Sequence, residues 1–460
     1  MAPDAAPGAG RGLMRVLVAG SGGREHALAW KLAAETSVDE VVVAPGSDAI
    51  ADIPGVAVVR EVDPLDPASV VRAARLADVD LVVVGPEAPL AAGVIDALAA
   101  ARIAAFGPTR AAAALESSKA FCHAVAEAAG VRMARSRAFT GGQLEPAFAW
   151  IRELDADGHS AVLKSDGLAA GKGVIVTTSL AQALGLAPSF LTGRPADEPA
   201  LVIEERLDGR EASVIAICDG TRAVALPAAR DHKRLCDADR GPNTGGMGAY
   251  SPLPDLPDER VEAIVEAIHR PMLDEMARRG TPFRGFLYAG LMLTSDGPAL
   301  LECNVRLGDP EAQVTLPRLT GELAPVLAAA SGGHLGDVAA APLGTAASGA
   351  AVGIVLAAKG YPGEPRRGDP IEGLDRAAGL GALVFHAGTI ARPNGGFGTN
   401  GGRVLTVVGR GADLEAARAL AERAAGEIHF DGMQRRHDIG ADVSPVPGVE
   451  PPSALAGVPA

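Results

Sequence analysis

The feature that most constrains the fold is a glycine-rich basic loop between two apolar segments. Residues 164–174 have the sequence KSDGLAAGKGV; the apolar residues 161–163 precede this loop and the β-branched segment 174–178 follows it. Because β-branched residues favour strands, the expected order is strand, loop, strand. A P-loop needs four residues between its glycines, Ser or Thr after its lysine, and a helix next. Gly167 and Gly171 enclose three residues and Gly173 follows Lys172, so we expect a hairpin flap over phosphates, or a plain glycine-rich turn.

The N-terminal part begins with an apolar segment, residues 15–19, followed by a glycine turn and a helical pattern from Ala27. Strand, glycine turn and helix open a doubly wound parallel sheet. Glu25 replaces the third glycine of a dinucleotide site, and the next strand, residues 41–46, ends without an acid for a ribose hydroxyl. A phosphate-bearing small molecule at Gly22, Gly23 and Arg24 is therefore favoured over NAD, because a helix N-terminus attracts anions.

Two further strands are expected at residues 80–84 and 103–106, with Glu87 between two prolines just after the first of them. Ligands of open α/β sheets bind beyond the carboxyl ends of the strands, so Glu87 and the glycine turn should share one rim. Glu87 is either a solvated turn acid or a ligand for sugar hydroxyls.

A strand pair at residues 285–293 and 298–306 carries the candidate metal site. Residues two apart in a strand share a face, so Glu302, Asn304 and Arg306 should point the same way. Two neighbouring oxygen ligands suit magnesium. The alternative is a cross-strand salt bridge between Glu302 and Arg306.

Residues 230–248 form a long segment without hydrophobic periodicity, and long irregular loops in compact domains are usually functional. Lys233 and Arg234 could supply positive charge for a phosphate or an acyl phosphate. His232 as a general base is the weaker alternative, because no nucleophile or orienting partner is evident near it.

Length and charge limit the class of protein. At ~150 residues per domain, the 460 residues predict about three domains. A net charge of -14 disfavours nucleic acid or an anionic membrane as partner. Four cysteines without C-x-x-C spacing favour reduced thiols in a cytoplasmic enzyme, and no apolar segment approaches the ~18 residues of a membrane span. Residues 1–13 lack the apolar core of a signal peptide and are expected to be a disordered leader. Residues 444–460 are expected to be a disordered tail.

Several long strings in a fixed order give the chain a family resemblance. From Met14 to about Asp442 it resembles the phosphoribosylamine–glycine ligase family of ATP-grasp enzymes. The strings are residues 20–27, 85–90, 166–174, 231–234, 241–250 and 306–311.

This resemblance implies an α/β and α+β multidomain fold. A doubly wound, Rossmann-like pre-ATP-grasp domain would span residues 14–117, and an ATP-grasp domain would span residues 118–345 with a hairpin-loop flap subdomain at about 135–204. A small C-terminal α/β domain would span residues 346–443.

The resemblance also implies a reaction. ATP would phosphorylate the glycine carboxylate, and the amine of 5-phosphoribosylamine would attack the acyl phosphate to give glycinamide ribonucleotide, ADP and phosphate. The metal, Mg²⁺ or Mn²⁺, would be held by Glu302 and Asn304. ATP would be held by Lys119, Lys164, Gly171, Lys172, Glu204, Glu205, Leu207 and Glu211. The substrates would be held by Gly22, Gly23, Arg24, Glu87, Asn243, Arg306, Asp309 and Glu311, with Arg306, Lys233 and Asp231 as catalytic residues.

The chain departs from the family pattern at three places. Ser165 replaces an alanine, Cys303 replaces an aromatic residue, and residues 285–293 contain no acid for a second metal.

Three rival functions remain. They are another ATP-grasp ligase or carboxylase, a nucleotide-binding regulator and an NAD-dependent oxidoreductase. We expect a monomer with small-molecule partners.

Overall fold

The computed structural model describes residues 13–168, 173–338, 343 and 349–441, and its N-terminal part is a parallel sheet. The strand order is β3-β2-β1-β4-β5, with the apolar strand β1 paired on both sides. The expected doubly wound sheet is therefore confirmed; the three-residue strand β3 was too short for its sequence to reveal it. The strands are β1 (Met14–Gly20), β2 (Val38–Pro45), β3 (Val56–Val58), β4 (Leu81–Val84) and β5 (Ala105–Phe106), and the helices are α1 (Gly23–Ala33), α2 (Pro67–Leu76), α3 (Glu87–Ala92) and α4 (Val94–Ala100).

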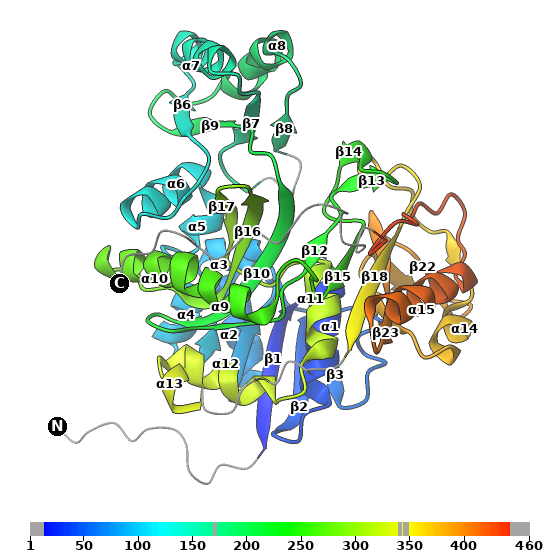
Figure 1. The fold of residues 1–460 in the computed structure, drawn as a ribbon. Helices are drawn as coiled ribbons and strands as arrows, with labels where there is room; N and C mark the ends of the chain where they lie inside the picture. The colour runs from blue at the N-terminus through cyan, green and yellow to red at the C-terminus, as the bar shows by residue number, and fades with distance from the viewer. Residues whose placement is uncertain (1–12, 169–172, 339–342, 344–348, 442–460) are drawn as a thin grey trace, which may run out of the picture.

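A four-stranded antiparallel sheet, in the order β11-β10-β16-β17, forms the centre of the molecule (Figure 1). Alternate side chains of β10 enter two different cores: Val214 and Ala216 belong to the cluster that includes residues of α10, whereas Ile215 and Ile217 belong to the cluster that includes residues of α12. Helices thus cover both faces of the sheet. The elements are β10 (Arg210–Asp219), β11 (Ala223–Ala225), β16 (Arg284–Thr294), β17 (Gly297–Asn304), α5 (Ala114–Ser117), α6 (Lys119–Ala128), α9 (Asp258–Ile264), η1 (Val265–His269), α10 (Arg270–Arg278), α11 (Glu311–Thr315), η2 (Leu316–Arg318), α12 (Leu323–Gly332) and α13 (Leu335–Val338).

The flap subdomain is a separate sheet with its own small core, and it projects above the body in Figure 1. Its strand order is β6-β9-β7-β8, and β7 pairs with β8 antiparallel, so the predicted hairpin is confirmed. The elements are β6 (Ser136–Thr140), α7 (Leu144–Ala156), β7 (Ala161–Ser165), β8 (Val174–Val176), α8 (Leu180–Leu191) and β9 (Pro199–Glu205). Gly171 and Lys172 lie outside the described residues.

The C-terminal sheet has the order β12-β15-β18-β23-β20, and two of its strands come from residues 230–251. The prediction of an irregular segment there was wrong, because β15 pairs with β18, about 100 residues later in the chain. The elements are β12 (Arg230–Asp231), β13 (Arg234–Cys236), β14 (Arg240–Asn243), β15 (Gly248–Ser251), β18 (Ala350–Ala357), β19 (Pro370–Ile371), α14 (Leu374–Gly379), β20 (Leu383–His386), β21 (Thr389–Ala391), β22 (Phe397–Thr399), β23 (Arg403–Gly411) and α15 (Leu414–Glu427).

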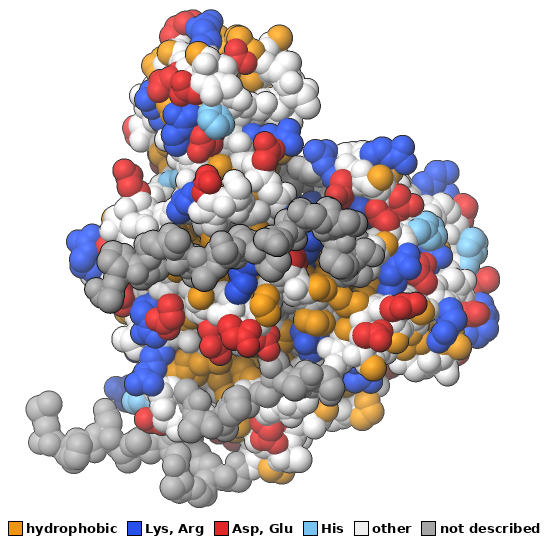
Figure 2. All heavy atoms as spheres, in the orientation of Figure 1, with side chains coloured by type: hydrophobic (Ala, Val, Ile, Leu, Met, Phe, Trp, Pro, Cys, Tyr) orange, Lys and Arg blue, Asp and Glu red, His pale blue; other side chains and the backbone are white. Residues whose placement is uncertain are grey.

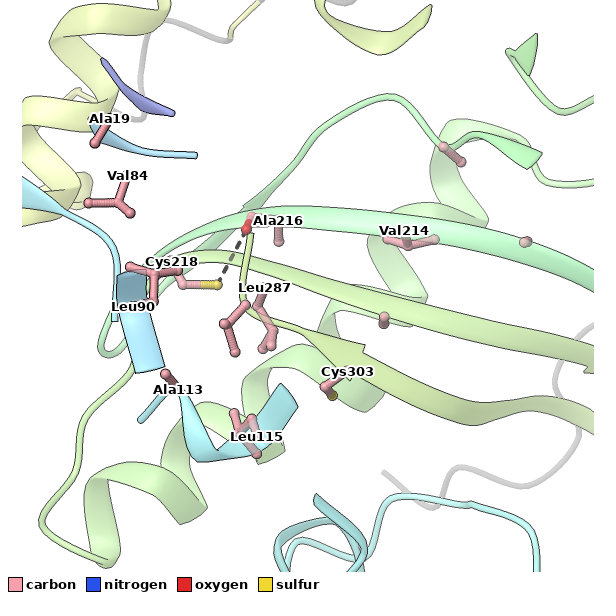
Figure 3. Packing of buried hydrophobic residues seen from close by; sticks show 14 of the residues in the cluster. Ala19, Val84, Leu90, Ala113, Leu115, Val214, Ala216, Cys218, Leu287 and Cys303 are labelled. Carbon is pink, nitrogen blue, oxygen red and sulfur yellow. Dashed lines mark hydrogen bonds between the residues drawn. The ribbon is translucent and has the colours of Figure 1, made fainter. Parts of the chain in front are cut away.

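One hydrophobic core joins the N-terminal sheet to the central sheet. Figure 3 shows side chains of β1, β4 and α3 close to side chains of β10 and β16, and all of them belong to one buried cluster. Cys303, which replaces the family's aromatic residue, is buried in this cluster and therefore affects packing. No helix among the described residues has the length and apolar character needed to cross a membrane.

Candidate active site

Lys164 lies at the base of the flap hairpin, held by a buried carboxylate. Its Nζ is 2.7 Å from Glu204 Oε2 and donates to the carbonyl of Leu301 at 3.0 Å. The other oxygen of Glu204 is 2.8 Å from His123 Nε2. Burial alone would raise the pKa of Glu204, but the Lys164 ammonium and the His123 hydrogen bond outweigh it and lower that pKa. The Glu204 side chain therefore orients Lys164.

Lys119, at the start of α6, is tied to the flap loop through Asp166. Asp166 Oδ1 accepts from the backbone N–H groups of Lys119 (2.5 Å) and Ala120 (3.2 Å), and Oδ2 accepts from the Ser118 hydroxyl. A carboxylate at a helix N-terminus accepts hydrogen bonds from the free N–H groups there and interacts favourably with the helix dipole. Lys119 Nζ in turn donates to the carbonyl of Gly167.

The candidate metal ligands lie at the end of β17, opposite a glycine. Glu302 pairs across the sheet with Gly290, and a Cβ built at Gly290 would lie 3.0 Å from Glu302 Cγ. The glycine thus leaves room for the carboxylate. Lys233 Nζ is 3.6 Å from Glu302 Oε1 and 2.8 Å from Glu211 Oε2.

Cations from four segments of the chain act on Glu302. Lys233 has the largest effect on the pKa of Glu302 and lowers it; Lys164, Arg306 and Lys119 lower it further, against burial. Four cations near one carboxylate, in a protein of net charge -14, are suited to a polyphosphate, and the Glu302 carboxylate is suited to a divalent metal that accompanies it.

Asp231, on β12, has the most perturbed carboxyl group near Lys233. Burial raises its pKa to about 8, Lys233 opposes this, and Glu311, Glu211 and Glu302 add to the increase. An acid with such a pKa can exchange a proton near neutral pH, which suits proton transfer at an active site.

The glycine turn of the N-terminal sheet holds Arg24 against two carboxylates. Glu25 Oε2 accepts from the N–H of Gly22 at 2.6 Å, and its Oε1 accepts from Arg24 Nε at 2.6 Å. Arg24 Nη1 lies 4.0 Å from Glu87 Oε2. Burial opposes ionisation of Glu87, but Arg306 and Arg24 lower its pKa. Glu25, which rules against a dinucleotide motif, thus acts as the buried anchor of this turn.

Arg306 reaches from the central sheet to Glu87. Its Nε is 3.2 Å from Glu87 Oε2 and its Nη2 is 3.0 Å from Glu116 Oε1. β17 ends at Asn304, so the expectation that Arg306 belongs to the strand was wrong. Arg306 forms its salt bridges with Glu87 and Glu116, so the alternative hypothesis of a salt bridge between Glu302 and Arg306 was wrong.

Two acids that follow Arg306 have separate roles. Asp309 lies 3.1 Å from Arg403 Nη2 of the C-terminal sheet and accepts from Gln313 Nε2 at 2.7 Å. Burial opposes ionisation of Asp309, but Arg403 and Arg24 lower its pKa. Glu311 is buried and accepts from Ser213 Oγ and Tyr288 OH, so it braces the central sheet.

Three other predicted residues lie at the edge of this constellation. Glu205 forms an ion pair with Arg135 at 2.9 Å, with its side chain turned away from Lys164 and Glu204. Leu207 is half-buried in the connection from β9 to β10, and Asn243 pairs with Arg234 in the β13–β14 hairpin. No described contact joins Asn243 to Arg306 or Glu302.

Sequence reasoning assigned no role to several residues that shape the site. Asp166 lies within the glycine-rich segment 164–174, and its position directly before Gly167 was the signal that could have indicated a role in the loop. His123 and Arg403 gave no such signal, because their partners Glu204 and Asp309 lie 81 and 94 residues away in the chain.

The surface seen in Figure 2 carries mixed charges. On the described part of this face, basic and acidic side chains are interspersed and do not gather into one extended basic area. This distribution gives no support to a nucleic-acid partner.

A central antiparallel sheet, a hairpin flap and a cluster of lysines around Glu302 define a protein of the ATP-grasp class. Three family models cover most of the chain: the N domain of phosphoribosylglycinamide synthetase matches residues 14–116, its ATP-grasp (A) domain residues 117–312 and its C domain residues 351–442. The chain belongs to the phosphoribosylglycinamide synthetase family, also called phosphoribosylamine–glycine ligase, as the sequence resemblance predicted.

Individual relatives agree with this assignment. The chain is 48% identical to a phosphoribosylamine–glycine ligase of Streptomyces coelicolor over 432 residues, which is 93% of this chain and 99% of that protein. It is 45% identical to the Leifsonia xyli protein of the same name over 431 residues, 93% of this chain and 100% of that protein.

Solved structures agree as well. A crystal structure of phosphoribosylamine–glycine ligase from Thermotoga maritima matches with a TM-score of 0.75 and 33% identity, covering 92% of this chain and 100% of the other. The biotin carboxylase domain of a Hydrogenobacter thermophilus 2-oxoglutarate carboxylase matches with a TM-score of 0.63 at 15% identity, covering 93% and 92%, which shows a shared fold.

Proposed function

We propose that the protein joins glycine to 5-phosphoribosylamine and cleaves ATP to ADP and phosphate. The observation that carries the proposal is a continuous set of charged groups. It runs from the cations around Glu302, through Arg306, to Glu87 and Arg24 at the glycine turn. One end suits a nucleotide with its metal, and the other suits a phosphosugar.

In the proposed first step, a glycine carboxylate oxygen attacks the γ-phosphorus of ATP, and ADP leaves. Lys164 and Lys119 bind the phosphates, Glu211 binds the ribose, and the backbone from Glu204 to Leu207 binds the adenine. The flap hairpin covers the phosphates and excludes water, and the ATP contacts of Gly171 and Lys172 are proposed from the sequence alone.

In the second step, the amine nitrogen attacks the carbonyl carbon of glycyl phosphate, phosphate leaves, and the nitrogen loses a proton. Arg306 and Lys233 neutralise the charge on the acyl phosphate. Asp231 takes the proton: burial raises its pKa to about 8, so its ionised form is a stronger base than an ordinary aspartate. Gly22, Gly23, Arg24 and Glu87 hold the phosphosugar, Asp309 lines the site, Asn243 lies at its edge, and Glu311 braces the strands beneath it.

The residues fit a divalent metal. Glu302 and Asn304 offer two oxygen ligands at the end of one strand, and Gly290 leaves space beside Glu302. Among the described residues no group of three or more acidic, His or Cys side chains forms a complete metal site. That agrees with magnesium, which takes its remaining ligands from phosphates and water. A bound Mg²⁺ or Mn²⁺ would screen the phosphate charge during transfer.

We further propose that the enzyme acts as a monomer in the cytoplasm on small-molecule substrates. All four cysteines are free thiols, in agreement with a reducing compartment.

The test is ADP formation by the purified protein with ATP, Mg²⁺, glycine and phosphoribosylamine generated from ribose 5-phosphate and ammonia. We expect ADP and phosphate only when both substrates are present. ADP formation no faster with both substrates than with either alone would refute the proposal. Turnover with a different acid or amine in a panel would instead identify another ATP-grasp ligase or carboxylase.

A further inference from the structure

Glu116, at the junction of the N-terminal and central sheets, is a buried carboxylate that the proposed reaction does not use. Its side chain is 8% exposed and belongs to the short helix α5. Oε1 accepts from Arg306 Nη2 at 3.0 Å, and Oε2 accepts from the backbone N–H of Val305 at 2.8 Å. Both oxygens of one carboxylate are thus bonded to two consecutive residues.

These two residues follow Asn304 directly. Because the Val305 N–H donates to Glu116, it does not continue the ladder between β16 and β17, and the strand ends at Asn304. Glu116 therefore fixes the backbone at the point where the chain passes from the candidate metal ligands to Arg306.

Glu116 also sets the direction of the Arg306 guanidinium. That group is planar and has five N–H donors, so several acceptors placed around it can define its orientation. Its Nε faces Glu87 at 3.2 Å, its Nη1 donates to the carbonyl of Leu307 at 3.1 Å, and its Nη2 faces Glu116. Without Glu116, the remaining carboxylate in an ion pair with the guanidinium would be Glu87, on the side of the proposed phosphosugar site.

We infer that Glu116 is a positioning residue that holds Arg306 between the nucleotide and phosphosugar halves of the active site. It contacts no substrate itself. The inference rests on the proposed function for the role of Arg306 in the reaction, whereas the placement of Arg306 by Glu116 can be tested without it.

The test is Glu116→Gln, which keeps an amide oxygen for the Val305 N–H and removes the charge that faces Arg306. We expect kcat to fall about 10- to 100-fold, because small misplacements of a positioned group have effects of this size. The KM for ATP should stay unchanged, and a crystal structure of the variant should show the guanidinium moved toward Glu87. Glu116→Asp, which restores the charge, should recover part of the lost kcat. If Glu116→Gln does not fold, Glu116→Asp is the test variant and should show a kcat below that of the wild type together with a displaced guanidinium; wild-type kcat with a displaced guanidinium would then overturn the inference.

The matched control is Glu35→Gln, another buried carboxylate, which accepts from the backbone N–H groups of Leu323 and Ala324. It should lower stability and leave kcat unchanged. Wild-type kcat in Glu116→Gln, or a lowered kcat with Arg306 unmoved, would overturn the inference. If the wild-type protein does not ligate the substrates, the proposed function fails, and the position of Arg306 in the Glu116→Gln crystal still decides the role of Glu116.

Discussion

Single residues at the active site bring four cations near one carboxylate in an acidic protein. Glu302 is the acid on which this arrangement depends, because Lys233, Lys164, Arg306 and Lys119 all act on it. Its side chain is about one-third exposed (35%), so it contributes little to the core and is available to a ligand.

Glu302→Ala should abolish turnover while the protein stays folded. The substitution removes the candidate metal carboxylate and leaves the neighbouring cations unbalanced, and we expect kcat to fall by about 10³-fold or more. The measurement is ADP release at saturating Mg²⁺, together with the thermal midpoint of unfolding. Asp296→Ala, at the exposed turn of the same strand pair, is the control and should keep wild-type kcat. Wild-type-like activity of Glu302→Ala at saturating metal would remove Glu302 from the metal site.

At the scale of elements, the N-terminus of α6 links the body of the enzyme to the flap. Asp166 directly follows β7, and its side chain accepts from the first N–H groups of α6, so the start of the flap loop and the start of this helix are fixed together. Lys119 and Lys164 are thereby placed at the same end of the flap hairpin.

Asp166→Ala should weaken both the helix start and the binding of nucleotide. Loss of the acceptor at a helix N-terminus costs about 1 kcal/mol of stability. Release of Lys119 should weaken binding of a non-hydrolysable ATP analogue about tenfold, equivalent to ~1.4 kcal/mol. Calorimetric titration and urea unfolding measure the two effects. Asp413→Ala, which removes the N-cap of α15, should show the stability loss alone; equal affinity in both variants would contradict the linkage.

The elements that the sequence predicted are those defined by local patterns. The buried parallel strands β1, β2 and β4 are continuous apolar segments, and the flap has a strand, a glycine loop and a second strand. The short strand β15 could not be predicted, because it pairs with β18, far along the chain, and the two-residue strand β12 forms only by pairing with β15. The candidate site could be predicted to the same extent. Residues within motifs could be named from the sequence. The ion pair of Glu204 with Lys164 and the end of β17 at Asn304 could not, because they depend on partners on other elements.

At the scale of the whole molecule, two buried histidines join the N-terminal and C-terminal sheets. His26 of α1 and His386 at the end of β20 stack with ring centroids 5.8 Å apart, and the backbone N–H of His386 donates to His26 Nδ1 at 3.2 Å. Burial, reinforced by the neighbouring His386, lowers the pKa of His26 to about 3, and burial lowers the pKa of His386 to about 4. Both rings are therefore neutral in the folded protein.

This pair should make the protein less stable in mild acid. Both folded-state pKa values lie below the ordinary 6.5, so below that pH the unfolded chain binds protons that the folded protein does not, and stability falls from about pH 6.5 toward pH 4. Each histidine should contribute a loss of about 2 kcal/mol between pH 6.5 and 5. His26→Gln keeps an acceptor for the His386 N–H without a titrating ring. Between pH 6.5 and 5 its free energy of unfolding, measured in urea, should therefore fall by about 2 kcal/mol less than that of the wild type. The remaining loss comes from His386 and from the buried His269, whose pKa is lowered to about 4. His334→Gln changes an exposed histidine and should follow the wild type. Parallel pH profiles for His26→Gln and the wild type would show that this interface does not carry the acid sensitivity.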